Sequence, residues 1–385
     1  MEPLFPQPGS TIAPANAVGR DRTTDRARRA FAAGSNLGIN DPRRMGKTVW
    51  LDILCADPGP GLLAVKVDYE GVRTSEEFLL RTVKALDAFQ GTPQRARARL
   101  SALFQGVEVA GAVPGTPISV KVGVSTRTPT DLLGETLAAV ADHLDEGVLL
   151  VVAMDEVPVA IDNIAINEGA ASANQLLQAL RDMRRREGRL RWIVCGSIGF
   201  HHILRRCGAT EGAINDLVNL PLGPLDETEA RELAARLCLG IGRPAAPEVV
   251  AALTEEAGRI PFLIHALAHH LHEAGSGPIS VGDVATAFED FIDDRDESKA
   301  VTHLVTRLDP LYGDRTKVAE AMLDEVARQG AVALTDLVAA HPGEPVGAIL
   351  DDLVDDHYLL VRQSMVGWRY PVLRRIWVSR RRLVP

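Results

Sequence analysis

The sequence predicts an α/β protein in which a sheet is sandwiched by helices, followed by an all-α region and a C-terminal winged helix. Three observations indicate this fold class. Apolar, β-compatible runs at residues 62–68 and 148–154 alternate with helical patterns, as expected for a sheet covered by helices. From residue 222 to about residue 299 the patterns are helical only. Residues 300–385 then give three helical segments followed by a β-hairpin.

The α/β part is assigned in chain order. A short strand is expected before residue 40, and an apolar helix follows Thr48. Capping residues at position 74 start a helix that runs to about Phe89. Residues 91–130 interrupt the alternation and predict an insertion with an Arg-rich helix and a hairpin. The later elements are helices at residues 132–144 and 175–183 and strands at residues 148–154 and 192–195.

The length of 385 residues predicts two or three domains. The first residues are rich in Pro, Ser and Gly and have no periodicity, which is typical of a flexible arm. A charged stretch near residue 295 predicts a hinge. The expected parts are an arm at residues 1–15, an α/β core at 16–222, a helical domain at 223–299 and a winged helix at 300–385.

The composition excludes several function classes. A net charge of -9 and an isoelectric point near 5.6 argue against a nucleic-acid footprint over the whole surface. No secretory leader and no apolar run of membrane-spanning length is found, so we expect a cytoplasmic protein without a membrane partner. The four cysteines have no Cys-x-x-Cys spacing, which excludes a zinc knuckle or a redox pair of that type.

The segment at residues 41–48 has the second half of a phosphate-binding loop. In such a P-loop, backbone N–H groups at a helix start hold the phosphates, here those of residues 44–48. Lys47 would reach the outer phosphates, and the Thr48 hydroxyl would hold Mg²⁺. The full pattern has Gly five residues before Gly46, where this chain has Asp41. Taken alone, the segment is equally compatible with a simple loop-to-helix junction.

Two later strands end in residues suited to nucleotide chemistry. An apolar strand delivers Asp155 and Glu156 to its carboxyl end, where Asp155 would hold Mg²⁺ and Glu156 would act as general base on water. This is the pattern of a Walker B motif. The strand ending at Cys195 is followed by Ser197, whose hydroxyl could sense the γ-phosphate. A serine in an ordinary turn is the alternative for Ser197.

Three further groups have two interpretations each. Arg20 could contact adenine or lie on a solvated helix. Arg205 and Arg206 could act in trans on the site of another subunit in a homo-oligomer, or be solvated. The residues His265, His269 and His272 share one helical stripe, but no accompanying carboxylate pattern supports a metal site there.

Together the motifs resemble the archaeal-type P-loop ATPases of the STAND and AAA+ neighbourhood, relatives of replication initiators of the Orc and Cdc6 type. The matching segments, in order, are residues 18–20, 41–48, 67–72, 154–158 and 195–199. Gly258 and Pro261 also resemble the Gly-x-x-Pro signature of the lid in such enzymes. The resemblance implies an additional-strand (ASCE), AAA+-like core with a helical lid, and ATP and Mg²⁺ as cofactors. The implied nucleotide-binding residues are Arg20, Pro42, Arg43, Arg44, Met45, Gly46, Lys47, Thr48, Val49 and Pro261.

Asp41 departs from the family pattern, which has Gly or another small residue there. We expect its carboxylate near the phosphates, where it would change affinity or turnover.

The winged helix has an acidic third helix. Residues 346–356 include Asp351, Asp352, Asp355 and Asp356, and no Lys or Arg occurs in residues 344–360. Such a helix would repel the DNA backbone, so base reading is not expected. The last stretch contains seven arginines and no acid, which leaves nonspecific DNA contact, an acidic protein partner or a solvated tail as alternatives.

The preferred interpretation is a Mg²⁺-dependent ATP-binding switch with slow hydrolysis. Its catalytic residues would be Lys47, Glu156 and Ser197, and Thr48 and Asp155 would hold the metal. Lid and winged helix would convert the ATP or ADP state into binding of a protein partner that the sequence does not identify. The alternative is a DNA-binding regulator or initiator with a structural nucleotide. A third hypothesis is a scaffold that has lost nucleotide binding through Asp41.

Overall fold

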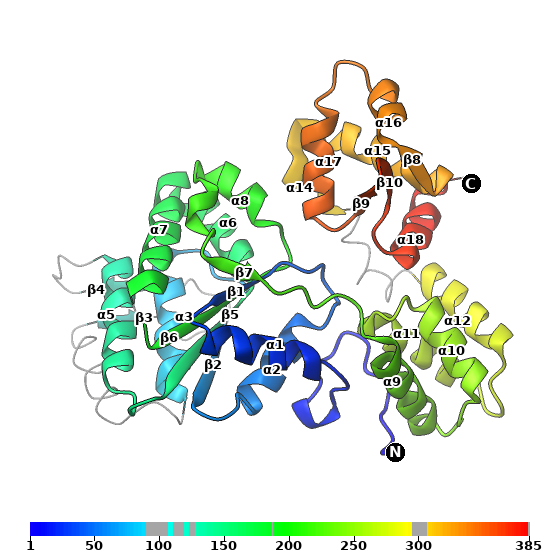
Figure 1. The fold of residues 1–385 in the computed structure, drawn as a ribbon, viewed down its shortest axis with the longest axis horizontal. Helices are drawn as coiled ribbons and strands as arrows, with labels where there is room; N and C mark the ends of the chain where they lie inside the picture. The colour runs from blue at the N-terminus through cyan, green and yellow to red at the C-terminus, as the bar shows by residue number, and fades with distance from the viewer. Residues whose placement is uncertain (90–106, 111–118, 123–127, 187, 295–305, 384–385) are drawn as a thin grey trace. The chain divides into compact units, whose positions relative to one another are not determined.

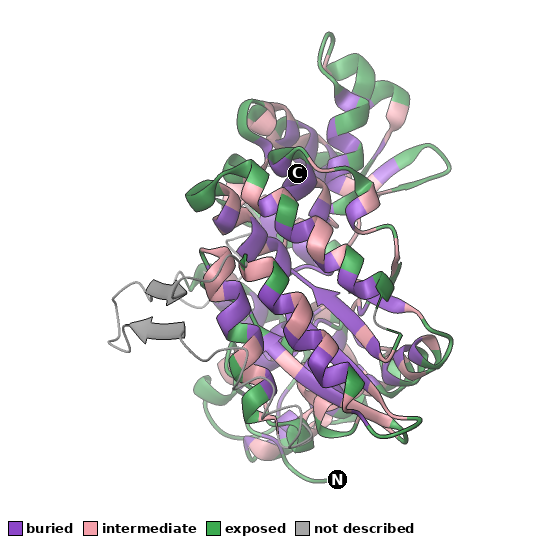
Figure 2. Cartoon of the chain, turned by 90° about the vertical axis from the view of Figure 1, so that its left-hand side faces the viewer, coloured by how far each residue is buried: buried purple, intermediate pink, exposed green. Residues whose placement is uncertain are grey.

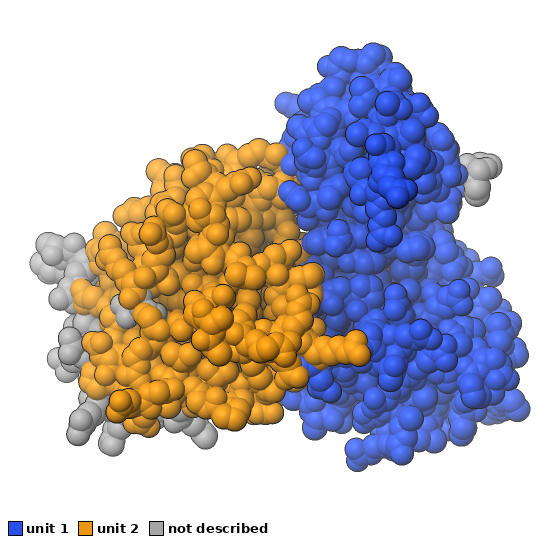
Figure 3. Space-filling model, viewed as in Figure 1, with its two compact units in different colours: residues 1–21, 41–49, 222–385 blue, residues 22–40, 50–221 orange. Residues whose placement is uncertain are grey.

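A computed structural model describes residues 1–89, 107–110, 119–122, 128–186, 188–294 and 306–383 (Figure 1). The chain forms two compact units (Figure 3). Unit 1 contains residues 1–21, 41–49 and 222–385, and unit 2 contains residues 22–40 and 50–221. The predicted phosphate loop therefore belongs with the helical and winged-helix parts and not with the sheet from which it extends. None of the helices among the described residues is both long and apolar enough to cross a membrane.

Unit 2 is built on a sheet of five parallel strands in the order β2-β5-β6-β1-β7. Buried strands lie between helices whose outer faces are exposed (Figure 2). The strands are β1 (Asn36–Ile39), β2 (Leu62–Asp68), β5 (Leu149–Asp155), β6 (Leu190–Cys195) and β7 (Leu217–Asn219). The helices are α1 (Asp21–Ala32), α2 (Lys47–Ala56), α3 (Ser75–Ala88), α5 (Pro129–Asp142), α6 (Val157–Glu168), α7 (Ala170–Arg186) and α8 (Phe200–Cys207). This confirms the predicted sheet between helices.

The insertion is confirmed in part. Strands β3 (Val107–Ala110) and β4 (Ser119–Val122) pair antiparallel, as the predicted hairpin requires. The Arg-rich helix expected at residues 94–104 lies outside the described residues.

The described residues of the lid in unit 1 form four helices. They are α9 (Glu227–Gly240), α10 (Pro247–Glu256), α11 (Pro261–Glu273) and α12 (Val281–Asp293). Helix α9 starts with a capping box in which the side chains of Asp226 and Glu229 accept from each other's backbone N–H. Helix α12 was not predicted.

Among its described residues, the winged-helix part contains five helices and a small antiparallel sheet in the order β8-β10-β9. Its elements are α14 (Leu308–Tyr312), α15 (Thr316–Gln329), β8 (Ala331–Ala333), α16 (Leu334–Ala340), α17 (Val346–Asp355), β9 (Leu359–Arg362), β10 (Met365–Trp368) and α18 (Pro371–Arg381). Of the alternatives for the last stretch, a solvated tail is excluded for residues 371–381, because α18 buries Ile376 and Trp377. Short 3₁₀ turns lie at Pro14–Asn16, Glu211–Ala213 and Gly313–Arg315.

The N-terminal arm also differs from the flexible segment that its composition predicts. Leu4 is buried, and its backbone N–H donates to the carbonyl of Arg236 over 3.0 Å. The Gln7 N–H donates to Nδ1 of His265, and Phe5 packs edge-on against His272. The first residues therefore dock on helices α9 and α11, and two of the three stripe histidines serve that docking.

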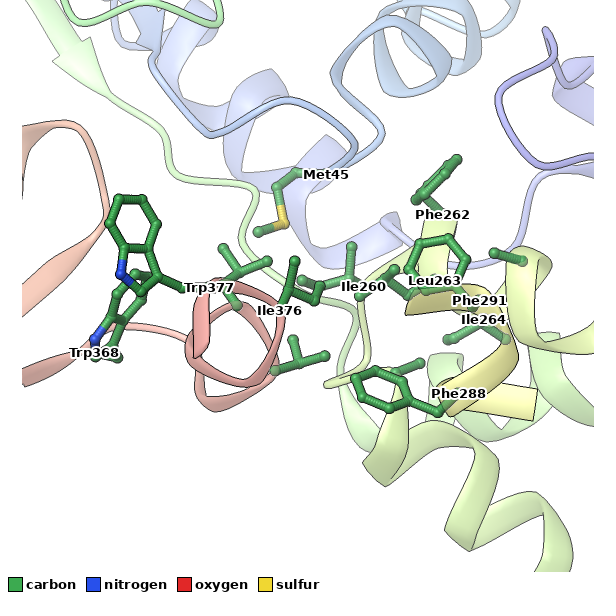
Figure 4. Close-up of a cluster of buried hydrophobic side chains, with 14 of the residues drawn as sticks. Met45, Ile260, Phe262, Leu263, Ile264, Phe288, Phe291, Trp368, Ile376 and Trp377 are labelled. Atoms are coloured by element: carbon green, nitrogen blue, oxygen red, sulfur yellow. The ribbon is translucent and has the colours of Figure 1, made fainter. Parts of the chain in front are cut away.

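One hydrophobic cluster joins the lid, the winged helix and the phosphate loop inside unit 1. Met45 of the loop belongs to it together with Ile260 of the lid and Ile376 of α18 (Figure 4). The cluster makes the loop part of the same packed core as the two C-terminal parts.

Candidate nucleotide site

The phosphate loop connects β1 to α2 and bends through two left-handed residues. Arg44 has φ 73° and Gly46 has φ 84°, a region that only glycine adopts without strain. Helix α2 begins at Lys47, so its first N–H groups have no partners within the helix and can face an anion. Lys47 is buried, and its Nζ donates to the carbonyls of Asp41 (2.5 Å) and Pro42 (2.8 Å). The Lys47 ammonium is therefore hydrogen-bonded to backbone carbonyls of the loop itself.

Lid residues contact this loop within unit 1. The guanidinium of Arg44 lies 4.7 Å from the ring centre of Phe262, and burial, with the nearby charge of Arg43, lowers the pKa of Arg44. A Cβ on Gly46 would lie 3.9 Å from Pro261. Of the other loop residues, Pro42 is buried, Val49 is half-buried, and Arg43 and Thr48 are exposed.

Two predicted side-chain placements are corrected here. Arg20 is neither solvated nor aimed at a base, because its guanidinium is buried and donates to the carbonyls of Met45, Leu222 and Gly223. The Asp41 carboxylate is buried as well and accepts from the backbone N–H groups of Leu222 and Gly223. It therefore serves the chain entering the lid and is not directed at phosphates.

Unit 2 supplies the acids at the carboxyl edge of its sheet. Asp155 ends β5 and is buried, and Glu156 follows with φ 55°, an uncommon left-handed conformation for a non-glycine residue. The Ser197 hydroxyl donates to Oε2 of Glu156 over 2.9 Å. A Cβ on Gly196 would lie only 2.4 Å from Pro158, so this turn requires glycine. The sequence analysis placed Glu156 and Ser197 after two different strands, and their hydrogen bond is a finding of the structure.

The strand order explains why these residues meet. Strand β6, which leads to Ser197, pairs with β5 on one side and with β1 on the other. Since all three strands are parallel, their carboxyl ends lie at one edge, where ligands bind in open α/β sheets. One strand between the loop strand and the acid strand is the additional-strand arrangement expected from the sequence.

The arginines proposed to act in trans have partners inside unit 2. Arg206 pairs with Asp162 over 2.5 Å, and Arg205 contacts the ring of His202 at 3.2 Å. Both arginines are exposed, as the solvated interpretation expects.

Sequence reasoning missed Phe262 and the dipeptide Leu222–Gly223. The available signal for the dipeptide was the proline on either side of it, because prolines have no backbone N–H and leave Leu222 and Gly223 as the donors of the segment.

The residues present fit a magnesium nucleotide by their chemistry. Lys47 and the N–H groups at the start of α2 suit phosphate. The Thr48 hydroxyl and the Asp155 carboxylate offer the hard oxygen ligands that Mg²⁺ prefers. A carboxylate held by a hydroxyl, as Glu156 is by Ser197, suits a group that orients water.

No protein-family model and no curated protein matches the sequence. Among solved structures, the chain is similar to the Walker-type ATPase PABY2304 of Pyrococcus abyssi, with a TM-score of 0.65 and 16% identity over 96% of this chain and 98% of that one. This likeness shows the fold, and with the strand order it confirms the expected sheet between helices, followed by a helical lid and a winged helix. Weaker matches are the ORC2 protein of Aeropyrum pernix (TM-score 0.49, 14% identity, 95% of each chain) and the RuvB branch migration motor of Thermotoga maritima (TM-score 0.41, 11% identity, 91% and 92%).

Proposed function

We propose that this chain is a Mg²⁺-dependent ATP-binding switch that hydrolyses ATP slowly and couples its ATP or ADP state to a protein partner. The hydrogen bond from Ser197 to Glu156 is the observation that carries the proposal. It joins the predicted base and the predicted sensor at the sheet edge, beside the strand from which the phosphate loop extends.

Each residue then has a defined task. Lys47 and the N–H groups of residues 44–48 bind the phosphates, while Thr48 and Asp155 would hold the metal. Mg²⁺, when bound, neutralises charge on the phosphate oxygens. Glu156 orients the attacking water, and Ser197 fixes the carboxylate of Glu156 and reports the γ-phosphate.

Contacts inside unit 1 give the switch a route to the C-terminal domain. A Cβ on Gly258 of the lid would lie 2.7 Å from Cγ1 of Val372 in α18, so the Val372 side chain packs directly against the Gly258 backbone. Arg375 of α18 pairs with Glu256 and lies over the ring of Phe288, 4.0 Å from its centre. A change at the loop therefore reaches α18 through packed contacts, which supports a partner-binding role for the winged helix.

A DNA-binding role has less support. Asp352 of α17 pairs with Arg315 at 2.8 Å, and Asp356 at the end of α17 accepts from the Tyr312 hydroxyl. Two of the four acids of this predicted third helix therefore stabilise the fold. Of the seven C-terminal arginines, five have protein partners: Arg369, Arg374, Arg375, Arg380 and Arg381. Truncation after Tyr370 would remove buried residues, so charge removal at exposed Arg362 and Arg382 is the cleaner test. No gel shift with the wild type at low salt would exclude this role.

Calorimetric titration with ATP and Mg²⁺ tests the proposed switch. We expect wild-type binding that Lys47→Ala abolishes and that Asp155→Ala makes insensitive to Mg²⁺. Lys84→Ala and Asp87→Ala on the exposed face of α3 are matched controls and should bind like wild type. Phosphate release measured on the same proteins gives turnover. Unchanged ATP binding in both loop and acid variants would show that the site is assigned to the wrong residues.

A further inference from the structure

The chain enters the lid through the segment Pro221-Leu222-Gly223-Pro224. Proline has no backbone N–H, so this segment has only two such donors. Both donate to Asp41: Leu222 to Oδ2 over 2.8 Å and Gly223 to Oδ1 over 2.9 Å. One carboxylate thus takes every N–H group of the segment.

Arg20 binds the carbonyls of the same dipeptide. Its Nη1 donates to Leu222 over 2.7 Å, and its Nη2 donates to Gly223 over 2.9 Å. The same Nη2 donates to the carbonyl of Met45 in the phosphate loop over 2.7 Å. All four backbone hydrogen-bonding groups of Leu222–Gly223 are therefore held by two opposite charges.

The backbone of Arg20 extends this network to the lid. Its N–H donates to Oε1 of Glu229 over 2.7 Å, while Oε2 of Glu229 closes the capping box of α9. Gly19 and Arg20 both have φ 79°, and a Cβ on Gly19 would lie 2.7 Å from Cδ of Glu229. The left-handed turn is thus required for this contact, and Gly19 permits it.

The two charged side chains that hold Leu222–Gly223 are buried. Asp41 is 2% exposed and Arg20 is 6% exposed. Burial lowers the pKa of Arg20, and the carboxylates of Glu229 and Asp41 oppose that effect. Buried charges keep their partners because water cannot replace them.

We propose that Asp41 and Arg20 are positioning residues that clamp the Leu222–Gly223 linker to the phosphate loop, so that loop and lid move as one body. The positioning role rests on the proposed ATP-binding function, whereas the clamp itself does not. It gives a reason for Asp41 where related loops have glycine, since glycine offers no acceptor for the two N–H groups.

Amide-resolved hydrogen exchange of the nucleotide-free protein tests the clamp. The Leu222 and Gly223 amides should be protected in the wild type and should exchange about tenfold faster or more in Asp41→Ala and Asp41→Gly. Asp41→Asn should be intermediate, because its amide oxygen can accept one N–H while its NH₂ group opposes the other. The control is Asp352→Asn, which removes another buried carboxylate of unit 1 and should leave these two amides protected.

ATP binding and turnover then test the positioning role. We expect the Kd for ATP to rise roughly tenfold in Asp41→Ala and less in Asp41→Asn, and the Tm increase on adding ATP to shrink in the same order. Asp352→Asn should lower the Tm without changing the ATP-induced increase. A purely structural role would make the Asp41 variants behave like this control.

The outcomes separate the two proposals. Unchanged protection in Asp41→Ala overturns the clamp even if ATP binds. Lost protection with an unchanged Kd overturns the positioning role. If the wild type binds no ATP, the proposed function and the positioning role both fall, while the exchange rates still decide whether the clamp exists.

Discussion

The Ser197 hydroxyl donates to Oε2 of Glu156 over 2.9 Å, joining the turn after β6 to the first residue after β5. Ser197 is 5% exposed, so water competes little for this bond. Glu156 at φ 55° has a backbone conformation that its neighbours must hold in place. The pair is the best-defined part of the candidate site.

Removing the Ser197 hydroxyl should slow turnover more than it weakens binding. For Ser197→Ala we expect kcat for ATP hydrolysis to fall roughly tenfold, the effect of ~1.4 kcal/mol in the barrier, because Glu156 loses its orienting donor. The Kd for ATP should change little. Ser197→Thr, which keeps the hydroxyl, should recover much of the rate in a phosphate-release assay. Equal losses of kcat and affinity in Ser197→Ala would contradict this role.

His265 should make stability depend on pH. Burial lowers the pKa of His265 to about 4, and its Nδ1 accepts from Gln7 only when that nitrogen carries no proton. Because the folded pKa is below the unfolded value near 6.5, this contribution is complete above pH 6.5 and is lost progressively as the pH falls toward 4. The loss should be on the order of 3 kcal/mol.

Urea unfolding between pH 7 and 4 measures this loss. His265→Gln cannot take up a proton and should flatten that part of the profile, whereas half-buried His143→Gln should keep the wild-type slope. Identical profiles for wild type and His265→Gln would show that His265 does not titrate as proposed.

Gly240 should be required for docking of the N-terminal arm. A Cβ there would lie 1.9 Å from the carbonyl oxygen of Leu4, which is backbone and cannot rotate away. We expect Gly240→Ala to release the arm and to speed exchange of the Leu4 amide, which donates to Arg236. A Cβ added at Gly347 in α17 would meet only open space, so Gly347→Ala should leave the free energy of unfolding unchanged or raise it by up to about 1 kcal/mol. Equal effects of the two changes would contradict the close approach.

Trp377 should be a major stabilising residue of the winged helix. Its ring is 1% exposed, and its Nε1 donates to Asp324 over 2.8 Å. Trp377→Ala should therefore lower the free energy of unfolding by about 3–5 kcal/mol. Trp377→Phe keeps an aromatic ring and should lower it less. Chemical denaturation followed by circular dichroism measures both. A solvated C-terminal tail would instead leave stability unchanged in either variant.

Local patterns were sufficient for most of the strands and helices. The runs that became β2 and β5 are long, apolar and bounded by turn residues, so their type could be read directly. Strand β7 was missed because it has only three residues and two of them are exposed. Helix α18 was missed because its arginines obscure the apolar positions at residues 372, 373, 376 and 377.

The sequence by itself determined which chemical groups are present and at which strand ends they lie. Lys47, Asp155, Glu156 and Ser197 follow from motif spacing, because a strand or loop fixes the place of its own next residue. Only the tertiary structure decided where the side chains of Asp41 and Arg20 go. Their partners lie 181 and 202 residues away in the chain, in a linker whose composition does not reveal its hydrogen-bonding needs. Buried backbone groups must find partners, and the fold alone brings the acceptor and the donor to them.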